Sequence, residues 1–322
     1  MRAAYAESID AENPLDGLVI GERPDPTPPD GWTRVAVKAA SLNHHDLWTL
    51  KGVGIKQEQL PMILGCDAAG IDEATGDEVV VHAVINTPGW TGDDTLDPGR
   101  TLLSEKHQGS IAEYVIVPAR NVVPKPAELS WAEAACLSTA WLTAYRMLFT
   151  RAQLKPGSSV LVQGASGGVA SACIAMARAA GMQVYATART EEKQAKALEL
   201  GAHDSFASGA RLPERVDAVM ETVGEATWSH SLKSLKPGGK LVVCGATSGP
   251  NPPADLNRVF FLQLQVLGST MGTKAELAAL ISFLRVTGLR PLIDRTIPLE
   301  SAAEGLQAIA SGELVGKIVL EL

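Results

Sequence analysis

One stretch, SSVLVQGASGGVASACIAMARAAG at residues 158–181, constrains the fold more than any other part of the chain. Its strand-forming run Val160–Val162 leads into a glycine-rich turn, and apolar residues beyond the turn recur at helical spacing. Glycines let the backbone approach a pyrophosphate, and the helix N-terminus offers it free N–H groups. The stretch therefore predicts a dinucleotide-binding unit, although its spacing is G-x-x-G-x-x-A and departs from G-x-G-x-x-G.

The residues around this stretch divide the chain into regions of different pattern. After the turn, short apolar runs such as MQVYATA, VDAVMETV and GKLVVCG alternate with helical segments, which predicts a parallel sheet covered on both faces. Residues 1–123 instead contain β-branched runs bounded by Gly, Pro and Asp, without a long amphipathic helix. The tail predicts two more helices and a final strand. The expected fold class is α/β, a doubly wound parallel sheet beside a β-rich region.

Composition narrows the class of protein. A chain of 322 residues with 46% hydrophobic and 20% charged residues predicts about two globular domains. The net charge of −8 disfavours nucleic acid and anionic membranes as partners. No run of 18 apolar residues predicts a membrane span, and no apolar run follows Arg2 as it would in a signal peptide. We therefore expect a cytoplasmic protein.

The stretch SLNHHDLWTLKG at 41–52 gathers three side chains that could bind a metal, His44, His45 and Asp46. The residues alone leave open a metal site, a proton relay through His45, or a polar loop without chemistry. The four cysteines, at 66, 136, 173 and 244, are far apart and form no CxxC pair, so they predict neither a zinc knuckle nor a redox motif.

The second strand of the predicted nucleotide unit indicates which dinucleotide binds. NAD-binding units usually place Asp or Glu at the end of this strand, where it binds the ribose 2′-OH. Here the strand VYATARTEEK ends in Ala188, Arg189 and Thr190. An Arg with a neighbouring hydroxyl suits a 2′-phosphate through charge-assisted hydrogen bonds. The sequence therefore predicts NADPH (or NADP) in preference to NADH.

Eight segments in order resemble the medium-chain dehydrogenase/reductase superfamily, in particular its zinc-free quinone oxidoreductase-like branch. They are SLNHHDLW, LGCDAAG, GSIAEYVIVP, TAWLTAY, VLVQGASGGVA, EEKQAKALELGA, SLKPGGKLVVCG and GKIVL. The resemblance covers essentially the full length and implies a GroES-like catalytic domain (1–123 and 273–322) and a Rossmann NADP-binding domain (124–272). It also implies hydride transfer between a nicotinamide and a carbonyl or activated alkene.

The resemblance implies no zinc site. Zinc-dependent members use Cys, His, and Cys or an acid where this chain has Asn43, Cys66 and Thr139, and amide or hydroxyl groups are poor zinc ligands. Their structural zinc lobe needs four close cysteines, whereas residues 86–108 contain none. We therefore expect no zinc.

By the same resemblance, two residues are expected to take part in catalysis. Asn43 aligns with an Asn near the nicotinamide ribose and substrate. His45 aligns with a proton-relay position and could protonate the product. The alternative for His45 is an ordinary hydrogen bond to the backbone.

Cofactor contacts are expected along the whole nucleotide. The glycine loop should hold the pyrophosphate, the second strand end the 2′-phosphate, Thr143 and Gly245 the nicotinamide half, and Lys317 the phosphates. The expected cofactor-binding residues are Thr143, Gly164, Ala165, Ser166, Gly167, Gly168, Val169, Thr187, Arg189, Thr190, Lys193, Gly245 and Lys317.

The function expected from these observations is NADPH-dependent reduction of an electrophilic small molecule, a quinone, enone or alkenal, without a metal. Two alternatives remain open: an alcohol or carbonyl dehydrogenase that uses His45 as relay, and a non-catalytic NADPH-binding or sensing protein. Because the last sheet strand of relatives pairs across a two-fold axis, the resemblance also implies a homodimer.

Overall fold

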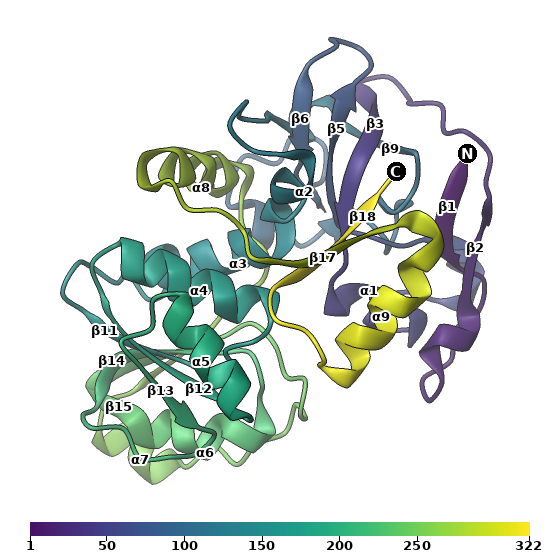
Figure 1. The fold of residues 1–322 in the computed structure, drawn as a ribbon. Helices are drawn as coiled ribbons and strands as arrows, with labels where there is room; N and C mark the ends of the chain where they lie inside the picture. The colour runs from purple at the N-terminus through teal and green to yellow at the C-terminus, as the bar shows by residue number, and fades with distance from the viewer. The chain divides into compact units, whose positions relative to one another are not determined.

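The computed structural model describes residues 1–322 and divides them into two compact units (Figure 1). The first unit comprises Met1–Leu142, Met271–Val286 and Ile293–Leu322, and the second comprises Thr143–Thr270 and Thr287–Leu292. The division falls at 142/143 and not at the expected 123/124. Residues 124–142 belong with the first unit because helix α2 (Trp131–Ala134) packs against its strands β3 (Trp32–Ser41) and β5 (Asp67–Asp72).

The second unit is built on a six-stranded sheet in which every neighbouring pair is parallel. The strands are β11 (Ser159–Val162), β12 (Gln183–Ala188), β13 (Asp204–Ala207), β14 (Val216–Glu221), β15 (Leu235–Val243) and β16 (Gln265–Gly268). Their order, β13-β12-β11-β14-β15-β16, is the 3-2-1-4-5-6 order of the Rossmann fold. All four residues of β11 are buried, as expected for a central strand covered on both faces. The prediction of a doubly wound sheet is confirmed.

Four helices connect these strands. They are α4 (Gly168–Ala179), α5 (Glu191–Glu199), α6 (Glu225–Ser234) and α7 (Leu256–Phe261). Because the chain runs outward from β11 in one direction and from β14 in the other, right-handed connections place α4 and α5 on one face and α6 and α7 on the opposite face (Figure 1). An irregular helical segment precedes the sheet in the chain. It consists of α3 (Leu142–Tyr145) and the π-helical segments on either side of it, Leu137–Trp141 and Arg146–Arg151.

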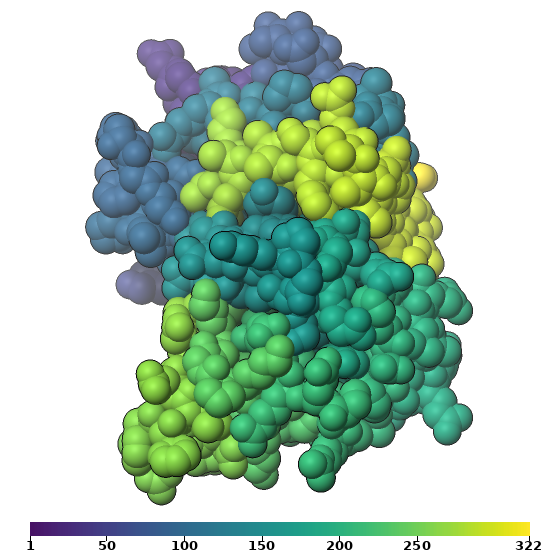
Figure 2. Space-filling model, turned by 90° about the vertical axis from the view of Figure 1, so that its left-hand side faces the viewer, coloured from purple at the N-terminus to yellow at the C-terminus, as the bar shows by residue number.

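The first unit is β-rich and uses both ends of the chain. Its main sheet has the order β10-β6-β5-β3-β18-β17, with β9 also paired to β3. Strand β18 near the C-terminus lies antiparallel to β3, with Val319 opposite Ser41. Figure 2 shows C-terminal residues, in yellow, against blue residues from the first part of the chain. The remaining bounds are β6 (Glu78–Val81), β9 (Tyr114–Pro118), β10 (Val122–Pro124), β17 (Ile293–Pro298) and β18 (Lys317–Glu321).

Smaller elements complete the first unit. They are β1 (Arg2–Ala6), β2 (Leu18–Glu22), β4 (Met62–Ile63), β7 (Val84–Ile85), β8 (Thr101–Leu102), α1 (His44–Leu50), α8 (Lys274–Thr287) and α9 (Ala302–Ser311). The predicted run at 33–43 corresponds to β3, which begins one residue earlier. The run at 77–85 contains β6 and β7, and the run at 111–119 contains β9. Strands β1, β2, β4, β5, β8, β10 and β17 were not predicted. None of the helices combines the length and apolarity that crossing a membrane requires.

Candidate functional site

The glycine-rich turn connects β11 to α4 and has the geometry of an anion cradle. Gly164 has φ +69°, and a Cβ there would lie 2.9 Å from Cγ2 of Val223, so glycine is the residue that fits. Gly167 is the N-cap of α4, and no side chain caps the first turn. The first N–H groups of α4 therefore have no acceptor within the helix. Because nothing lies within 4 Å of a Cβ built at Gly167, a phosphate can approach these N–H groups.

The end of β12 presents the expected 2′-phosphate residues. Arg189 is exposed and makes no hydrogen bond or ion pair within the chain. Thr190 caps α5, where its Oγ1 accepts a hydrogen bond from the Lys193 N–H at 3.3 Å. Arg189, Thr190 and Lys193 are thus brought together at the N-terminus of α5, and the strand itself ends in Ala188 without a carboxylate. This end of the sheet can accept an anionic group.

Thr187 does not belong to that set. Its side chain is fully buried, and its hydroxyl donates to Oε1 of Gln163 at 2.5 Å. The hydroxyl does not reach the place expected for a 2′-phosphate, because it is buried and bonded to Gln163. Its carbonyl oxygen instead accepts the N–H of Ala165 at 2.9 Å and so holds the glycine loop.

The two residues expected along the nicotinamide half lie in different places in the second unit. Gly245 follows β15, where a Cβ would meet the carbonyl oxygen of Thr222 at 3.0 Å. Thr143 is a buried residue of α3. Gly245 is at the carboxyl edge of the sheet, the edge at which ligands bind in open α/β folds.

In the first unit a buried polar cluster surrounds Lys317. Its ammonium donates to Leu42 O at 2.7 Å and to Oδ1 of Asn43 at 2.6 Å, and lies 3.4 Å from Oδ2 of Asp67. The amide of Asn43 donates to the same Asp67 oxygen at 2.8 Å, and the Ser41 hydroxyl donates to it at 2.7 Å. Lys317 and Asp67 are 3% and 0% exposed, so this is a buried ion pair.

This cluster changes the roles expected of two residues. We expected Lys317 to contact the cofactor phosphates. Its ammonium instead uses its three donors within the first unit. Asn43 donates its second amide hydrogen to Ser41 O at 3.2 Å, which leaves it no free donor for a substrate. Its backbone N–H donates to Asp46 at 2.8 Å at the start of α1. Asp67, which sequence reasoning missed as a functional residue, follows Cys66 directly in LGCDAAG.

His45 lies between a thiol and a carboxylate. Its Nδ1 is 3.4 Å from Sγ of Cys66, and its Nε2 is 3.2 Å from Oε1 of Glu105. Burial alone would lower the pKa of His45, but Cys66 and Glu105 together raise this pKa well above 6.5. Burial raises the pKa of the Cys66 thiol, whereas the charge of His45 and its hydrogen bond lower it. The Glu105 carboxylate faces the other ring nitrogen, and the hydrogen bond to His45 lowers the pKa of Glu105 against the effect of its burial. Glu105 was missed because 60 residues separate it from His45.

Asp46, the third residue of the HHD stretch, has a structural role. Its carboxylate accepts the N–H groups of Asn43 at 2.8 Å and Gly65 at 3.0 Å. Burial raises the pKa of Asp46 to about 6, although the hydrogen bond from Asn43 and the charge of His45 oppose this. The residue joins α1 to the segment that carries Cys66.

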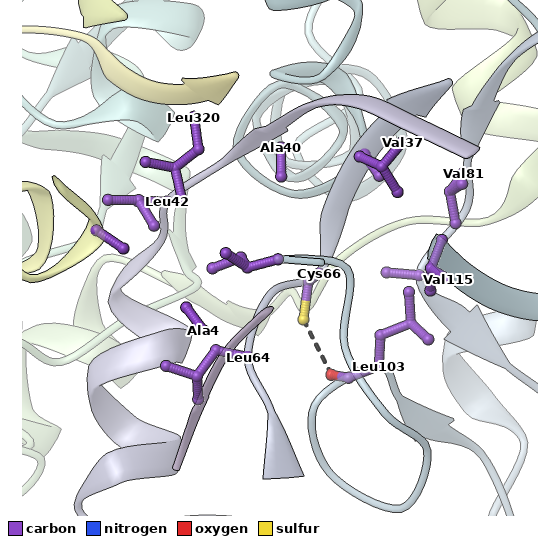
Figure 3. Close-up of a cluster of buried hydrophobic side chains, with 14 of the residues drawn as sticks. Ala4, Val37, Ala40, Leu42, Leu64, Cys66, Val81, Leu103, Val115 and Leu320 are labelled. Carbon is purple, nitrogen blue, oxygen red and sulfur yellow. Dashed lines mark hydrogen bonds between the residues drawn. The ribbon is translucent and has the colours of Figure 1, made fainter. Parts of the chain in front are cut away.

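The positions that hold zinc in related enzymes do not fit a metal here. Cys66 lies in the apolar core of the first unit beside Leu42 and Leu64, and its Sγ donates to Leu103 O at 3.1 Å (Figure 3). The Asn43 amide donates to Ser41 and Asp67, and Thr139 offers only a hydroxyl, a poor zinc ligand. No group of three or more His, Cys, Asp and Glu residues is placed to hold a metal ion.

The fold defines a two-domain protein with a Rossmann unit, a class of unit that binds dinucleotides, and comparison with known proteins identifies its family. The alcohol dehydrogenase GroES-like domain model matches residues 29–127, and the zinc-binding dehydrogenase model matches residues 168–285. The chain belongs to the medium-chain dehydrogenase/reductase superfamily, in its quinone oxidoreductase-like branch.

Individual relatives cover most of the chain. Quinone oxidoreductase of Homo sapiens is 31% identical over 318 residues, which span 92% of this chain and 91% of the relative. Crotonyl-CoA carboxylase/reductase of Cereibacter sphaeroides is 30% identical over 82% of this chain and 74% of its own. A solved NAD-dependent alcohol dehydrogenase is 33% identical, with a TM-score of 0.93 and full coverage of both chains.

Proposed function

We propose that the chain is an NADPH-dependent oxidoreductase that transfers a hydride to a quinone, an enone or an alkenal without a catalytic metal. In the reaction NADPH gives a hydride to the electron-poor carbon or oxygen of the acceptor and leaves as NADP⁺. A proton completes the reduced product. The identity to quinone oxidoreductases supports this acceptor class.

The choice of NADPH rests on the end of β12. Exposed Arg189 has no partner within the chain and lies next to Thr190, where an NAD-binding unit would carry an acid. A guanidinium can bind a 2′-phosphate through two parallel hydrogen bonds. A solved crotonyl-CoA carboxylase/reductase in complex with NADP, 25% identical with a TM-score of 0.88, supports the same cofactor.

Besides the likeness to quinone oxidoreductases, one observation of the structure supports the acceptor class: the donors of Asn43 and Lys317 are used inside the first unit. Reduction of an unactivated ketone needs a Lewis acid or free hydrogen-bond donors aimed at the developing alkoxide. A quinone or enone spreads the incoming charge over its own conjugated system. Internally satisfied donors therefore favour acceptors that are already activated.

His45 supplies the proton in this proposal by exchanging its contact with Glu105 for one with the reduced acceptor, because both ring nitrogens have partners within the chain. The Glu105 carboxylate lies 3.2 Å from Nε2 of His45 and favours the imidazolium, the form that can donate a proton. Glu105 is partly exposed and can pass a proton from solvent back to the ring. Asn43, in contrast, uses both amide hydrogens within the Lys317–Asp67 cluster, so we assign it a positioning role.

The second candidate is an alcohol or carbonyl dehydrogenase, favoured by the likeness to the NAD-dependent alcohol dehydrogenase structure. Parallel assays separate the two candidates. The quinone 1,4-naphthoquinone, an enal and a simple ketone are each tested with NADPH and with NADH, and a primary alcohol is tested with NADP⁺ and with NAD⁺. We expect turnover of the quinone and enal with NADPH. Selective turnover of the ketone and alcohol with NAD(H) would establish the second candidate.

A homodimer is proposed as the assembled state. Edge strand β16 and helix α7 expose Leu256, Phe260, Phe261 and Val266, an apolar group that a second copy of the sheet edge would cover. Light scattering of the purified protein tests this, and we expect the mass of a dimer. A Phe261→Glu variant should shift the protein toward monomer, and a monomeric wild type would refute the proposal.

A further inference from the structure

A buried network of polar side chains lies beneath the nucleotide cradle of the second unit. Thr187 donates to Oε1 of Gln163 at 2.5 Å, and the Gln163 amide donates to Ser231 Oγ at 2.9 Å. Ser231 donates in turn to Oε2 of Glu221 at 2.5 Å. These four side chains are fully buried and come from β12, the end of β11, α6 and the end of β14.

The network ends on the carboxylate of Glu221. Its Oε1 accepts the N–H groups of Val223 at 2.8 Å and Gly224 at 3.0 Å, and both oxygens accept the hydroxyl of Thr227 at 2.8 and 2.9 Å. No cation pairs with Glu221, although the side chain is 0% exposed. The hydrogen bonds that the carboxylate accepts offset the cost of burying it and tie it to the turn. What the carboxylate does is fix the turn between β14 and α6.

This turn contacts both neighbouring loops at the carboxyl edge of the sheet. Cγ2 of Val223 lies 2.9 Å from the position that a Cβ of residue 164 would take. Val223 therefore packs against the glycine loop and limits its shape. The carbonyl of Val223 accepts the N–H of Ser248 at 2.8 Å, from the loop that follows Gly245. On the other side, Thr187 holds the glycine loop through its carbonyl and holds Gln163 through its hydroxyl.

We infer that Glu221, with the Gln163–Thr187–Ser231 network, is a positioning group that holds the three loops of the nucleotide cradle in the conformation that binds the cofactor. The inference rests on the proposed nucleotide binding. Loops that are fixed before binding need no ordering when the nucleotide arrives, so loss of the network lowers the fraction of binding-competent protein.

The structure supplies a matched control in the same two central strands. Oδ2 of Asp217, near the start of β14, accepts the N–H of Ser159 at 2.7 Å and its hydroxyl at 2.9 Å, and its Oδ1 pairs with Lys236 at 2.9 Å. Asp217 and Ser159 lie at the amino edge of the sheet, and Glu221 lies at the carboxyl edge. Asp217→Asn therefore perturbs a polar cluster of the same sheet away from the cradle.

The test measures NADPH and NADH affinity by nucleotide fluorescence, and the melting temperature, for full-length variants. We expect Glu221→Gln and Thr187→Val each to weaken NADPH binding roughly tenfold at a temperature where all variants are folded. Thr187→Ser, which keeps the hydroxyl, should bind as the wild type does. Asp217→Asn should lower the melting temperature without changing the affinity.

Two results would overturn the inference, and they are distinguishable. If Glu221→Gln and Thr187→Val melt earlier but bind NADPH as tightly as the wild type, the network is merely structural. Should Glu221→Gln fail to fold, the contrast between Thr187→Val and Thr187→Ser decides alone. A wild type that binds neither NADPH nor NADH overturns the proposed function itself, and the inference with it.

Discussion

Replacement of Arg189 by Ala should change which nicotinamide nucleotide the protein uses. Arg189 follows the buried strand β12, is exposed, and makes no contact that its removal would break within the chain. The variant should therefore fold as the wild type does. The guanidinium has a free face for hydrogen bonds to a 2′-phosphate, a group that NADPH carries and NADH lacks.

The size of the effect follows from the bonds that are lost. A hydrogen bond to a charged group contributes about 1.5–3 kcal/mol, and each 1.4 kcal/mol is about a tenfold change in an equilibrium or rate ratio. Arg189→Ala should therefore lower kcat/KM for NADPH by roughly ten- to a hundredfold and leave kcat/KM for NADH within about twofold. The assay follows oxidation of each nucleotide with 1,4-naphthoquinone as acceptor.

A matched control separates this contact from general loss of positive charge. Lys155 is an exposed cation of the second unit that lies just before β11, at the amino edge of the sheet. Lys155→Ala should change kcat/KM for the two nucleotides by equal, small factors. An Arg189→Ala enzyme with the wild-type preference would refute the assignment of Arg189 to the 2′-phosphate.

Three further predictions follow from the contacts described. Glu105→Gln removes a carboxylate that raises the pKa of His45, so the loss of kcat on raising the pH should begin at a lower pH than in the wild type. An unshifted pH profile would exclude His45 as proton donor. Lys317→Met leaves buried Asp67 without its cation and should lower the free energy of unfolding by about 3–5 kcal/mol, measured in urea; a loss under 1 kcal/mol would contradict the pairing. Gly164→Ala, at φ +69°, should destabilise the protein by about 1–3 kcal/mol and weaken NADPH binding. The comparison is Gly167→Ala, where nothing lies within 4 Å of the added Cβ. Equal behaviour of the two variants would show that the loop does not require glycine at position 164.

The second unit was predictable from sequence because its signals are local. The central strands β11, β12, β14 and β15 contain short apolar runs, the longer helices have their own periodicity, and the glycine turn joins two such elements. Two of the missed strands, β2 and β17, lack these signals. In β17, half-exposed residues alternate with exposed ones, and in β2 none of the residues is buried. Their pairing depends on partners far along the chain.

The side-chain partners of the site were harder to predict for the same reason. Lys317 and Asp67 are separated by 250 residues, and His45 and Glu105 by 60, so no motif contains both members of either pair. Thr187 shows a second limit. Its strand was predicted, but a central parallel strand is buried on both faces, so alternation does not show whether a hydroxyl meets a ligand or another side chain.

The most direct test of the account is turnover of 1,4-naphthoquinone with NADPH before and after exhaustive treatment of the purified protein with a chelator, with metal content measured on the same samples. We predict that kcat and KM stay unchanged and that zinc is substoichiometric in both samples. Loss of activity on chelation, with recovery when Zn²⁺ is restored, would contradict metal-free hydride transfer.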